Sequence, residues 1–146
     1  MDGDGQHDPT CLKELISPIL EGKADLVIGS RYLGEKGFKS SVLRRAGIRF
    51  FSFLYYILTG KKVTDPTSGF RALNKRVVEF VSREYPSDYP EAESLILFHK
   101  MGFVLKEIPV AMKERQGGAS SINFLNSIYY MVKVTLSMVI GALKEV

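Results

Sequence analysis

The chain has 146 residues, of which 45% are hydrophobic and 25% are charged, and its formal net charge is +4. This length suits one domain that buries about two-thirds of its unfolded surface, and the composition excludes a disordered tail, a collagen-like repeat and a protein with several membrane spans. The one cysteine, Cys11, excludes an internal disulfide framework and a cysteine-based zinc site.

The hydrophobic pattern predicts helices and strands in alternation. A helix is expected over residues 9–20, with Asp8 as N-cap and Pro9 in its first position, followed by a buried strand over residues 24–30. Further helices are expected over residues 41–58, 74–83 and 88–101, with Gly60 and Gly102 as stop signals. Residues 103–110 predict a second strand, so the fold class is α/β.

The helix expected over residues 41–58 is amphipathic. Its apolar face consists of Leu43, Ala46, Phe50, Phe53, Leu54 and Ile57, and another side carries Arg45, Arg49, Ser52 and Tyr56. Residues 36–62 are basic without any acid, whereas residues 1–10 are acidic without Lys or Arg. Such a pair of segments suits a site that holds a cation beside a phosphate, and a solvated surface is the alternative. Nucleic-acid binding fits less well, because the basic residues alternate with apolar ones at helical spacing.

The segment from Ile122 to Leu143 is nearly all apolar and long enough to span a bilayer, which takes about 20 residues. Lys133 lies at its middle, where a lysine in a spanning helix costs about 2.5–3.5 kcal/mol. The polar positions form one narrow stripe: Asn126, Tyr130, Lys133, Ser137, Gly141 and Lys144. The pattern favours a helix that lies in a membrane interface or packs on a partner, with a spanning helix and an ordinary core helix as alternatives.

Two carboxylates near the start, Asp2 and Asp4, are separated by one glycine. On an extended or turning backbone they can share one hard divalent cation, and Mg²⁺ or Mn²⁺ held in this way takes its other ligands from phosphate and water. A calcium loop of the EF-hand type is excluded, because it would need glycine at His7 and glutamate at Lys13. The same spacing is also common in loops that bind no metal.

The order of motifs resembles family 2 glycosyltransferases, in particular the polyprenyl-phosphate group that is similar to dolichol-phosphate mannose synthase. The segment Asp2-Gly-Asp-Gly-Gln-His-Asp-Pro9 resembles the family's metal motif. Residues 25–32 match the strand that follows it, and residues 63–72 match the acceptor-side loop. Residues 85–93 and 112–122 match late segments of bacterial members, so the resemblance covers most of residues 1–122.

The resemblance implies a GT-A fold, of which this chain holds the C-terminal portion: a Rossmann-like mixed sheet with flanking helices, plus a C-terminal amphipathic helix. Carried over by position, Asp2 and Asp4, with Gln6 nearby, hold the divalent metal on the donor diphosphate. A metal there stabilises the charge that builds on the leaving group as the glycosidic bond breaks. For Gln6, a side chain that stabilises a turn is an equal alternative.

Asp65, which precedes Pro66 in a polar turn, is the predicted acceptor-side carboxylate. It would orient or deprotonate an acceptor, but a lipid phosphate is already an anion, and toward that acceptor Asp65 would position rather than deprotonate. An Asx turn that holds its own backbone is the alternative. Glu91 and Glu93, at the start of a helix, are second candidates for the base, although the helix dipole also explains acids at this place.

Phosphate groups need fixed cations, and the planar guanidinium of arginine suits them. The resemblance places such residues at Arg31, at Arg44 or Arg45, and at Arg115. Ser120 and Ser121 follow a pair of glycines and would supply small donors in a loop able to close over a diphosphate.

We therefore expect a metal-dependent, inverting transfer of a hexose from a GDP- or UDP-hexose to a polyprenyl phosphate such as dolichyl or undecaprenyl phosphate. The alternatives are the same fold acting on a saccharide acceptor of the cell envelope, and a truncated, non-catalytic module associated with a membrane. The expected location is cytoplasmic and peripheral, on the inner face of the membrane. A homodimer or a separate membrane-anchor protein is a further expected partner, and nucleic acid is not.

Residues 1–121 are expected to form part of the catalytic domain, and residues 122–146 the membrane-interface or partner-packing helix. In the enzymes that the motifs resemble, the paired aspartates follow the nucleotide-binding strands. At about 30 residues per βαβ unit, we expect about 60–100 residues of nucleotide-binding region ahead of Asp2 in a complete enzyme, which makes this chain a fragment.

Overall fold

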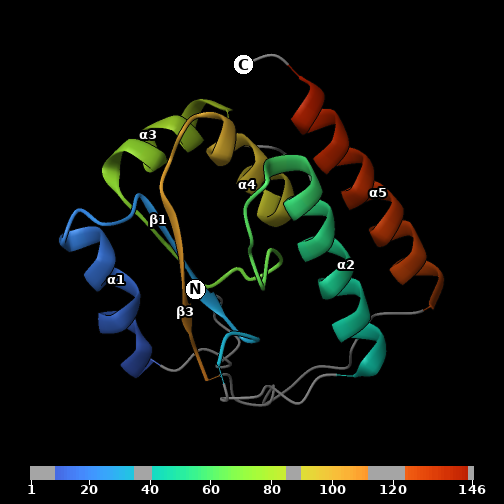
Figure 1. Cartoon of the computed structure of the whole chain (residues 1–146), viewed down its shortest axis with the longest axis horizontal. Coiled ribbons are helices and arrows are strands. Elements are labelled where there is room, and N and C mark those ends of the chain that lie inside the picture. The colour runs from blue at the N-terminus through green and yellow to red at the C-terminus, as the bar shows by residue number, and fades with distance from the viewer. Residues whose placement is uncertain (1–8, 35–40, 85–89, 112–123, 145–146) are drawn as a thin grey trace.

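The structure is a computed structural model that describes residues 9–34, 41–84, 90–111 and 124–144. These residues form a three-stranded sheet in the order β2-β1-β3, with helices on both faces (Figure 1). β1 (Leu26–Ser30) pairs in parallel with β3 (Leu105–Pro109) and antiparallel with β2 (Arg71–Leu73). The α/β class predicted from the sequence is confirmed.

β1 is buried along its whole length because both faces of the sheet are covered. Successive side chains of a strand point to opposite faces. Leu26 and Ile28 accordingly belong to one hydrophobic cluster, and Val27 belongs to the other. The predicted strands correspond to β1 and β3, whereas the short β2 was not predicted.

α1 (Leu12–Leu20) covers one face of the sheet and follows a 3₁₀ turn at Pro9–Cys11. Its side of the core contains Cys11, Leu15, Ala24, Val27, Phe70 and Val110. The helix predicted over residues 9–20 is confirmed, while its expected N-cap, Asp8, lies outside the described residues.

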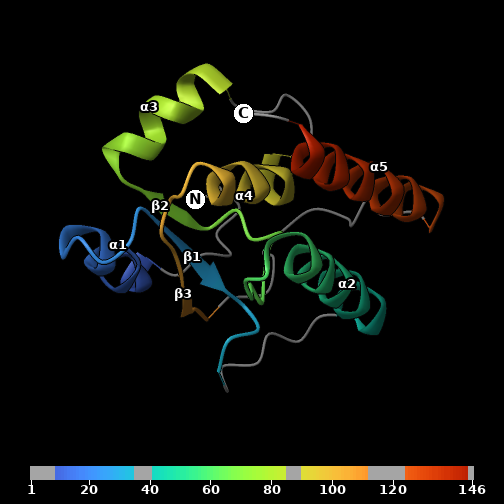
Figure 2. The same cartoon turned by 45° about the horizontal axis from the view of Figure 1, so that its top comes forward.

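The other face is covered by α2 (Val42–Thr59) and α4 (Pro90–Lys100), with α5 (Phe124–Leu143) beside them (Figures 1 and 2). α3 (Lys75–Glu84) follows β2. The buried side chains of this larger cluster include Leu26, Ile28, Phe51, Tyr55, Val77, Leu95, Ile96, Val134 and Met138. Each of these helices lies close to its predicted range.

α2 begins and ends as the sequence indicates. The Ser41 hydroxyl accepts the N–H of Arg44 at 3.3 Å, and Gly60 adopts a left-handed φ of +69° after the last turn. Its buried side, however, consists of Ile48, Phe51 and Tyr55.

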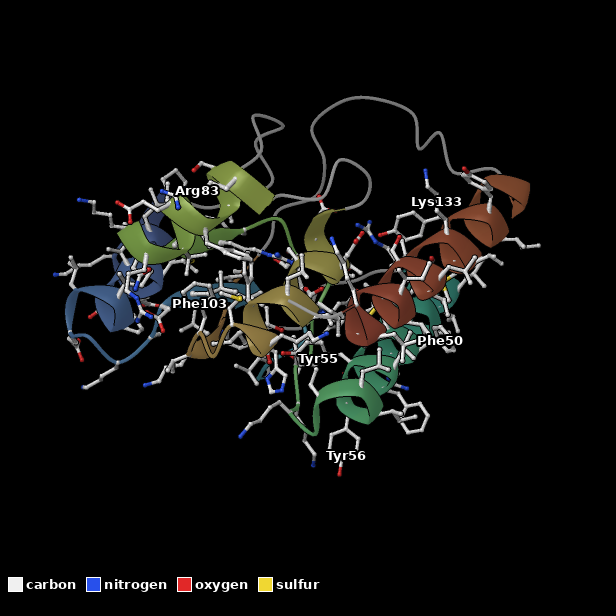
Figure 3. All side chains as sticks on the ribbon, turned by 90° about the horizontal axis from the view of Figure 1, so that it is seen from above. Phe50, Tyr55, Tyr56, Arg83, Phe103 and Lys133 are labelled. Atoms are coloured by element: carbon white, nitrogen blue, oxygen red, sulfur yellow. The ribbon has the colours of Figure 1, made fainter. Side chains whose placement is uncertain are left out.

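Most of the apolar face predicted for this helix is turned outward, although Leu54 packs against the core. Leu43, Phe50, Phe53 and Ile57 are 64%, 43%, 62% and 60% exposed. The helix carries two apolar stripes, and helical periodicity does not say which of them faces the sheet. Figure 3 shows Tyr55 between α2 and α4, whereas Tyr56 points away from the molecule.

α5 packs against α4 and α2 rather than standing apart from them. Val134 and Met138 have no exposed surface, and the Lys100 ammonium of α4 donates to the carbonyl groups of Gly141 and Ala142 at 3.2 and 2.8 Å. Val132, Leu136 and Ile140 remain exposed on its outer side. None of the described helices is both long and apolar enough to cross a membrane.

Candidate functional site

The candidate site lies at the carboxyl ends of β1 and β3, the edge at which sheets with parallel strands bind ligands. Arg31 and Tyr32 follow β1 directly, and the polar turn of residues 64–69 lies beside them (Figure 2). The Ser68 hydroxyl ties this turn to the strand by donating to the Gly29 carbonyl at 2.7 Å. Residues far apart in the sequence are thereby brought to one place.

Asp65 and Arg31 form a buried, bidentate ion pair in this turn. Arg31 Nε donates to Asp65 Oδ2 at 2.6 Å, and Arg31 Nη2 donates to Oδ1 at 2.7 Å. The backbone N–H of Arg31 also donates to Oδ2, at 3.1 Å. Thr67 completes the arrangement, since its hydroxyl accepts from Arg31 Nη2 at 3.1 Å.

Burial alone would lower the pKa of the Arg31 guanidinium, but the hydrogen bonds and the charge of Asp65 outweigh it and raise the pKa above its usual value. Arg31 therefore stays a cation, and Asp65 is its counter-ion. The two side chains are only 6% and 0% exposed, so neither can lose its partner without leaving a charge buried.

Glu107, in the middle of β3, holds the start of the same turn. Its Oε1 accepts the backbone N–H groups of Thr64 and Asp65, each at 3.0 Å, and the Thr64 hydroxyl at 3.0 Å. Burial raises the pKa of the Glu107 carboxyl, although these hydrogen bonds act in the opposite direction. A strand of the sheet thus fixes the backbone on either side of the Thr64–Asp65 peptide.

Arg71 holds the turn from its other end. Its guanidinium donates to the carbonyl groups of Pro66 at 2.9 Å and Ser68 at 2.7 Å. It also donates to the Glu91 carbonyl at 2.6 Å and to the Ser94 hydroxyl at 3.0 Å, both in α4. The turn is therefore tied to the start of α4 as well as to the sheet.

A pocket of about 290 Å³ opens between this turn and α2. Its lining consists of Tyr32, Arg45, Ile48, Arg49, Ser52 and Thr64. Arg45 and Arg49 lie one helical turn apart, which places them on the same side of α2. The described lining holds two guanidinium groups and no carboxylate, so the pocket is suited to an anion such as phosphate.

The structure places the predicted site residues in different surroundings. Arg45 lines the pocket, Arg31 and Asp65 pair with each other, and Arg44 is an exposed residue of the first turn of α2. Glu91 and Glu93 lie half-buried in the first turn of α4. Six predicted residues lie outside the described residues: Asp2, Asp4, Gln6, Arg115, Ser120 and Ser121. Their roles, like that of Asp65 toward an acceptor, stay predictions.

The sequence analysis did not select Tyr32, Arg49, Ser52 or Glu107 as site residues. Arg49 carried a signal, because it lies four residues after Arg45 and therefore on the same helix face. Glu107 is an acid in a predicted strand of a covered sheet, which is also an unusual place for a charge. Within the described residues, no group of three or more His, Cys, Asp or Glu side chains could hold a metal ion.

Comparison with known proteins gives the family. Residues 1–81 match the model of glycosyl transferase family 2. The chain belongs to this family.

An uncharacterized protein of Methanocaldococcus jannaschii is 35% identical over 112 residues, which are 75% of this chain and 46% of that protein. The UDP-N-acetylglucosamine–dolichyl-phosphate N-acetylglucosaminyltransferase of Methanococcus voltae is 34% identical over 112 residues, 75% of this chain and 45% of that enzyme. The polyprenol monophosphomannose synthase of Mycolicibacterium smegmatis is 30% identical over 138 residues, 92% of this chain and 52% of that enzyme. The chain thus spans about half the length of the curated relatives it matches.

Proposed function

We propose that this chain is part of a glycosyltransferase that transfers a hexose from a nucleotide-sugar to a polyprenyl phosphate. The observation that carries the proposal is the cationic pocket between α2 and the Thr64–Gly69 turn, at the carboxyl end of β1. Two relatives support the same acceptor class, because the name of one contains dolichyl phosphate and the name of the other contains polyprenol.

In this proposal the acceptor phosphate binds between Arg45 and Arg49, with Ser52 and Thr64 at the wall of the pocket. One phosphate oxygen attacks the anomeric carbon of the sugar while the bond to the nucleoside diphosphate breaks, which inverts the configuration. The electron pair leaves with the diphosphate, and the nucleophile has no proton to lose.

The buried Asp65–Arg31 pair fits such a reaction. A carboxylate that is held by a guanidinium and has no exposed surface is a weak general base, but an anionic acceptor does not need one. We therefore assign Asp65 to fixing Arg31 at the end of β1, beside Tyr32 of the pocket.

Asp2 and Asp4, with Gln6, are proposed to bind Mg²⁺ or Mn²⁺ on the donor diphosphate, because carboxylate and amide oxygens are ligands that such cations prefer. A bound metal would stabilise the charge of the leaving diphosphate. Asp4→Ala should abolish both transfer and the Mn²⁺-dependent binding of a nucleoside diphosphate measured by calorimetry. Unchanged metal-dependent binding in this variant would contradict the assignment.

The transfer itself is tested with the purified chain, Mn²⁺, undecaprenyl or dolichyl phosphate, and radiolabelled UDP-N-acetylglucosamine or GDP-mannose. Label in the organic phase supports the proposal. Label in an aqueous oligosaccharide would instead indicate a saccharide acceptor. No label from either donor, together with no nucleotide-sugar binding, would favour a non-catalytic module.

The pocket is tested by Arg45→Gln and Arg49→Gln, with Arg83→Gln on the distant α3 as the matched control (Figure 3). Each pocket variant should raise the KM for the lipid phosphate about tenfold, since a hydrogen bond to a charged group is worth about 1.5–3 kcal/mol. The KM for the nucleotide-sugar should stay unchanged. If only the KM for the nucleotide-sugar rises, the acceptor phosphate does not bind in this pocket.

The same proposal gives the protein a peripheral position at a membrane surface. Exposed apolar residues of two neighbouring helices form what we call the α2–α5 surface: Leu43, Phe50, Phe53 and Ile57 of α2, with Val132, Leu136 and Ile140 of α5. The two helices are in contact, since the rings of Phe51 and Tyr130 lie 6.0 Å apart. α2 also carries arginines and no acid, and an apolar stripe flanked by cations is typical of helices at anionic lipid surfaces.

This position is tested by fluorescence, because the chain contains no tryptophan. Phe53→Trp should show a blue-shifted emission when vesicles of phosphatidylcholine and phosphatidylglycerol are added, while Val78→Trp on α3, another exposed apolar position, should not. Equal shifts for both variants would contradict docking by the α2–α5 surface. A dimer in sedimentation that Phe53→Glu dissociates would assign the surface to a second copy of the chain instead.

A further inference from the structure

Glu107 is a half-buried acid of the site, and it acts on two separate features. It lies opposite Ile28 in the parallel β1–β3 pair, so its backbone is fixed by the centre of the sheet. Its carboxylate reaches across to the turn, where Oε2 accepts the Thr64 N–H at 2.8 Å and Oε1 accepts the Asp65 N–H at 3.0 Å. Thr64 lines the pocket, and Asp65 holds Arg31.

The hydrogen bonds of Glu107 give the network one direction. The Thr64 hydroxyl donates to Glu107 Oε1 at 3.0 Å, so the hydroxyl oxygen is left to accept. The Ser30 hydroxyl, 2.6 Å away, must therefore be the donor to Thr64. Ser30 in turn accepts the N–H of Tyr32 at 3.2 Å. The donors thus run from the N–H of Tyr32, a second residue of the pocket, through Ser30 and Thr64 to the Glu107 carboxylate.

An acid in this place is expensive for the fold. Removing a carboxylate from water costs free energy, and its hydrogen bonds in the protein do no more than offset this cost. An apolar side chain at the same position is often at least as stabilising as the buried carboxylate. The raised pKa of the Glu107 carboxyl reflects this desolvation. The fold alone therefore gives little reason for an acid here, whereas Thr64 of the pocket is hydrogen-bonded to it through both its N–H and its hydroxyl.

We infer that Glu107 is a positioning residue: its carboxylate fixes Thr64, Asp65 and, through Ser30, Tyr32, and so sets the shape of the anion pocket. This inference rests on the proposed function only for the ligand that the pocket takes. The placement of the turn by Glu107 is a separate statement, and it can be tested without any ligand.

The first measurement is amide hydrogen exchange of the full chain by NMR. In Glu107→Ala the amides of Thr64 and Asp65 lose their acceptor, and we expect them to exchange at least about tenfold faster than in the wild type. The amides of β1, such as Ile28, should keep their protection. Glu79→Gln, which removes an exposed carboxylate of α3, is the matched control and should change neither group.

The second measurement is calorimetric binding of farnesyl phosphate, a short soluble polyprenyl phosphate. Glu107→Ala should bind it about tenfold more weakly, and Glu107→Gln, which keeps one acceptor oxygen, should lie between that variant and the wild type. Glu79→Gln should bind like the wild type. A graded loss that follows the exchange of the Thr64 and Asp65 amides supports positioning by Glu107.

The inference is overturned if the Thr64 and Asp65 amides of Glu107→Ala keep their wild-type exchange rates. If that variant loses protection everywhere because it unfolds, Glu107→Gln decides: a folded protein with both wild-type exchange in the turn and wild-type affinity for farnesyl phosphate also overturns the inference. A wild-type chain that does not bind farnesyl phosphate would contradict the proposed acceptor. The exchange rates would still decide the role of Glu107 in that case.

Discussion

Asp65 and Arg31 behave as one unit, because each satisfies the charge of the other inside the protein. Removing one member leaves an unpaired buried charge, which typically costs about 3–5 kcal/mol. We expect Asp65→Ala and Arg31→Met each to lower the free energy of unfolding by this amount. Urea denaturation monitored by circular dichroism measures both.

The double variant Arg31→Met/Asp65→Leu tests the coupling. It has no charge left to bury, so it should recover most of the stability that either single change loses. If the loss of unfolding free energy in the double variant equals the sum of the two single losses, the ion pair does not explain the loss of stability in the single variants.

The ionisation of Glu107 predicts a pH dependence. Its pKa in the folded protein is raised above the usual 4.5, so the folded state binds the proton more tightly than the unfolded state does. The resulting stabilisation is fully present below pH 4.5 and is lost as the pH rises through the raised pKa. The free energy of unfolding of the wild type minus that of Glu107→Gln should therefore fall as the pH rises from 4.5. A difference that does not vary with pH would contradict this.

The residues of the site were only partly predictable. The resemblance offered Arg44 or Arg45, and of these two Arg45 lines the pocket, although its role toward a phosphate stays a prediction. Glu107 was not predicted, because its partners lie 43 and 42 residues away in the sequence, and no local pattern shows that a strand residue will meet a turn. The pairing of Arg31 with Asp65 was missed for the same reason, since both were considered separately as groups facing a ligand.

At the scale of the elements, local signals determined most boundaries. Pro90 at the start of α4, Ser41 and Gly60 around α2, and the apolar run of β1 are all local features. β2 was missed because three residues are too few to show an alternation, and its pairing with β1 is what makes it a strand. The orientation of α2 also required the rest of the molecule, since its basic side borders the pocket and one apolar stripe is left outside.

Two glycines in different elements should respond to alanine in opposite ways. A Cβ on Gly29, in β1, would lie 2.7 Å from Phe70 Cδ1 and 3.0 Å from a methyl group of Val110, and both neighbours are buried. Gly29→Ala should therefore lower the free energy of unfolding by about 1–3 kcal/mol.

Gly47, inside α2, is the matched case in which the added methyl group would meet only the end of a flexible side chain. A Cβ there would lie 3.4 Å from the sulfur of Met131, the end of a flexible side chain. Gly47→Ala should raise the free energy of unfolding by about 0.5–1 kcal/mol, because alanine is the better helix former. Urea denaturation of both variants checks the pair, and a loss of stability in Gly47→Ala would mean that α5 packs too tightly on α2 to accept a methyl group.

For the whole molecule, the central feature is that α2 serves two surfaces at once. One side lines the cationic pocket with Arg45 and Arg49, and another side contributes Phe50 and Phe53 to the α2–α5 surface. A lipid phosphate has a charged head and an apolar tail, so one helix can face both parts. In the proposed complex the phosphate head enters the pocket from the side of the bilayer. The protein can therefore bind the lipid phosphate while it stays at the membrane surface.

This arrangement predicts two separable contributions to membrane binding. Charge attraction is screened by salt, whereas burial of apolar side chains is not, so cosedimentation with phosphatidylglycerol vesicles should weaken from about 50 mM to about 500 mM NaCl but persist. Lys61→Gln/Lys62→Gln, which neutralises exposed charges just after α2, should reduce only the salt-sensitive part of the vesicle binding. Phe53→Glu should reduce the part that remains at high salt, because it places a carboxylate in the apolar stripe. If high salt releases the wild type completely, the α2–α5 surface makes no apolar contact with the bilayer, and the basic residues alone hold the protein there.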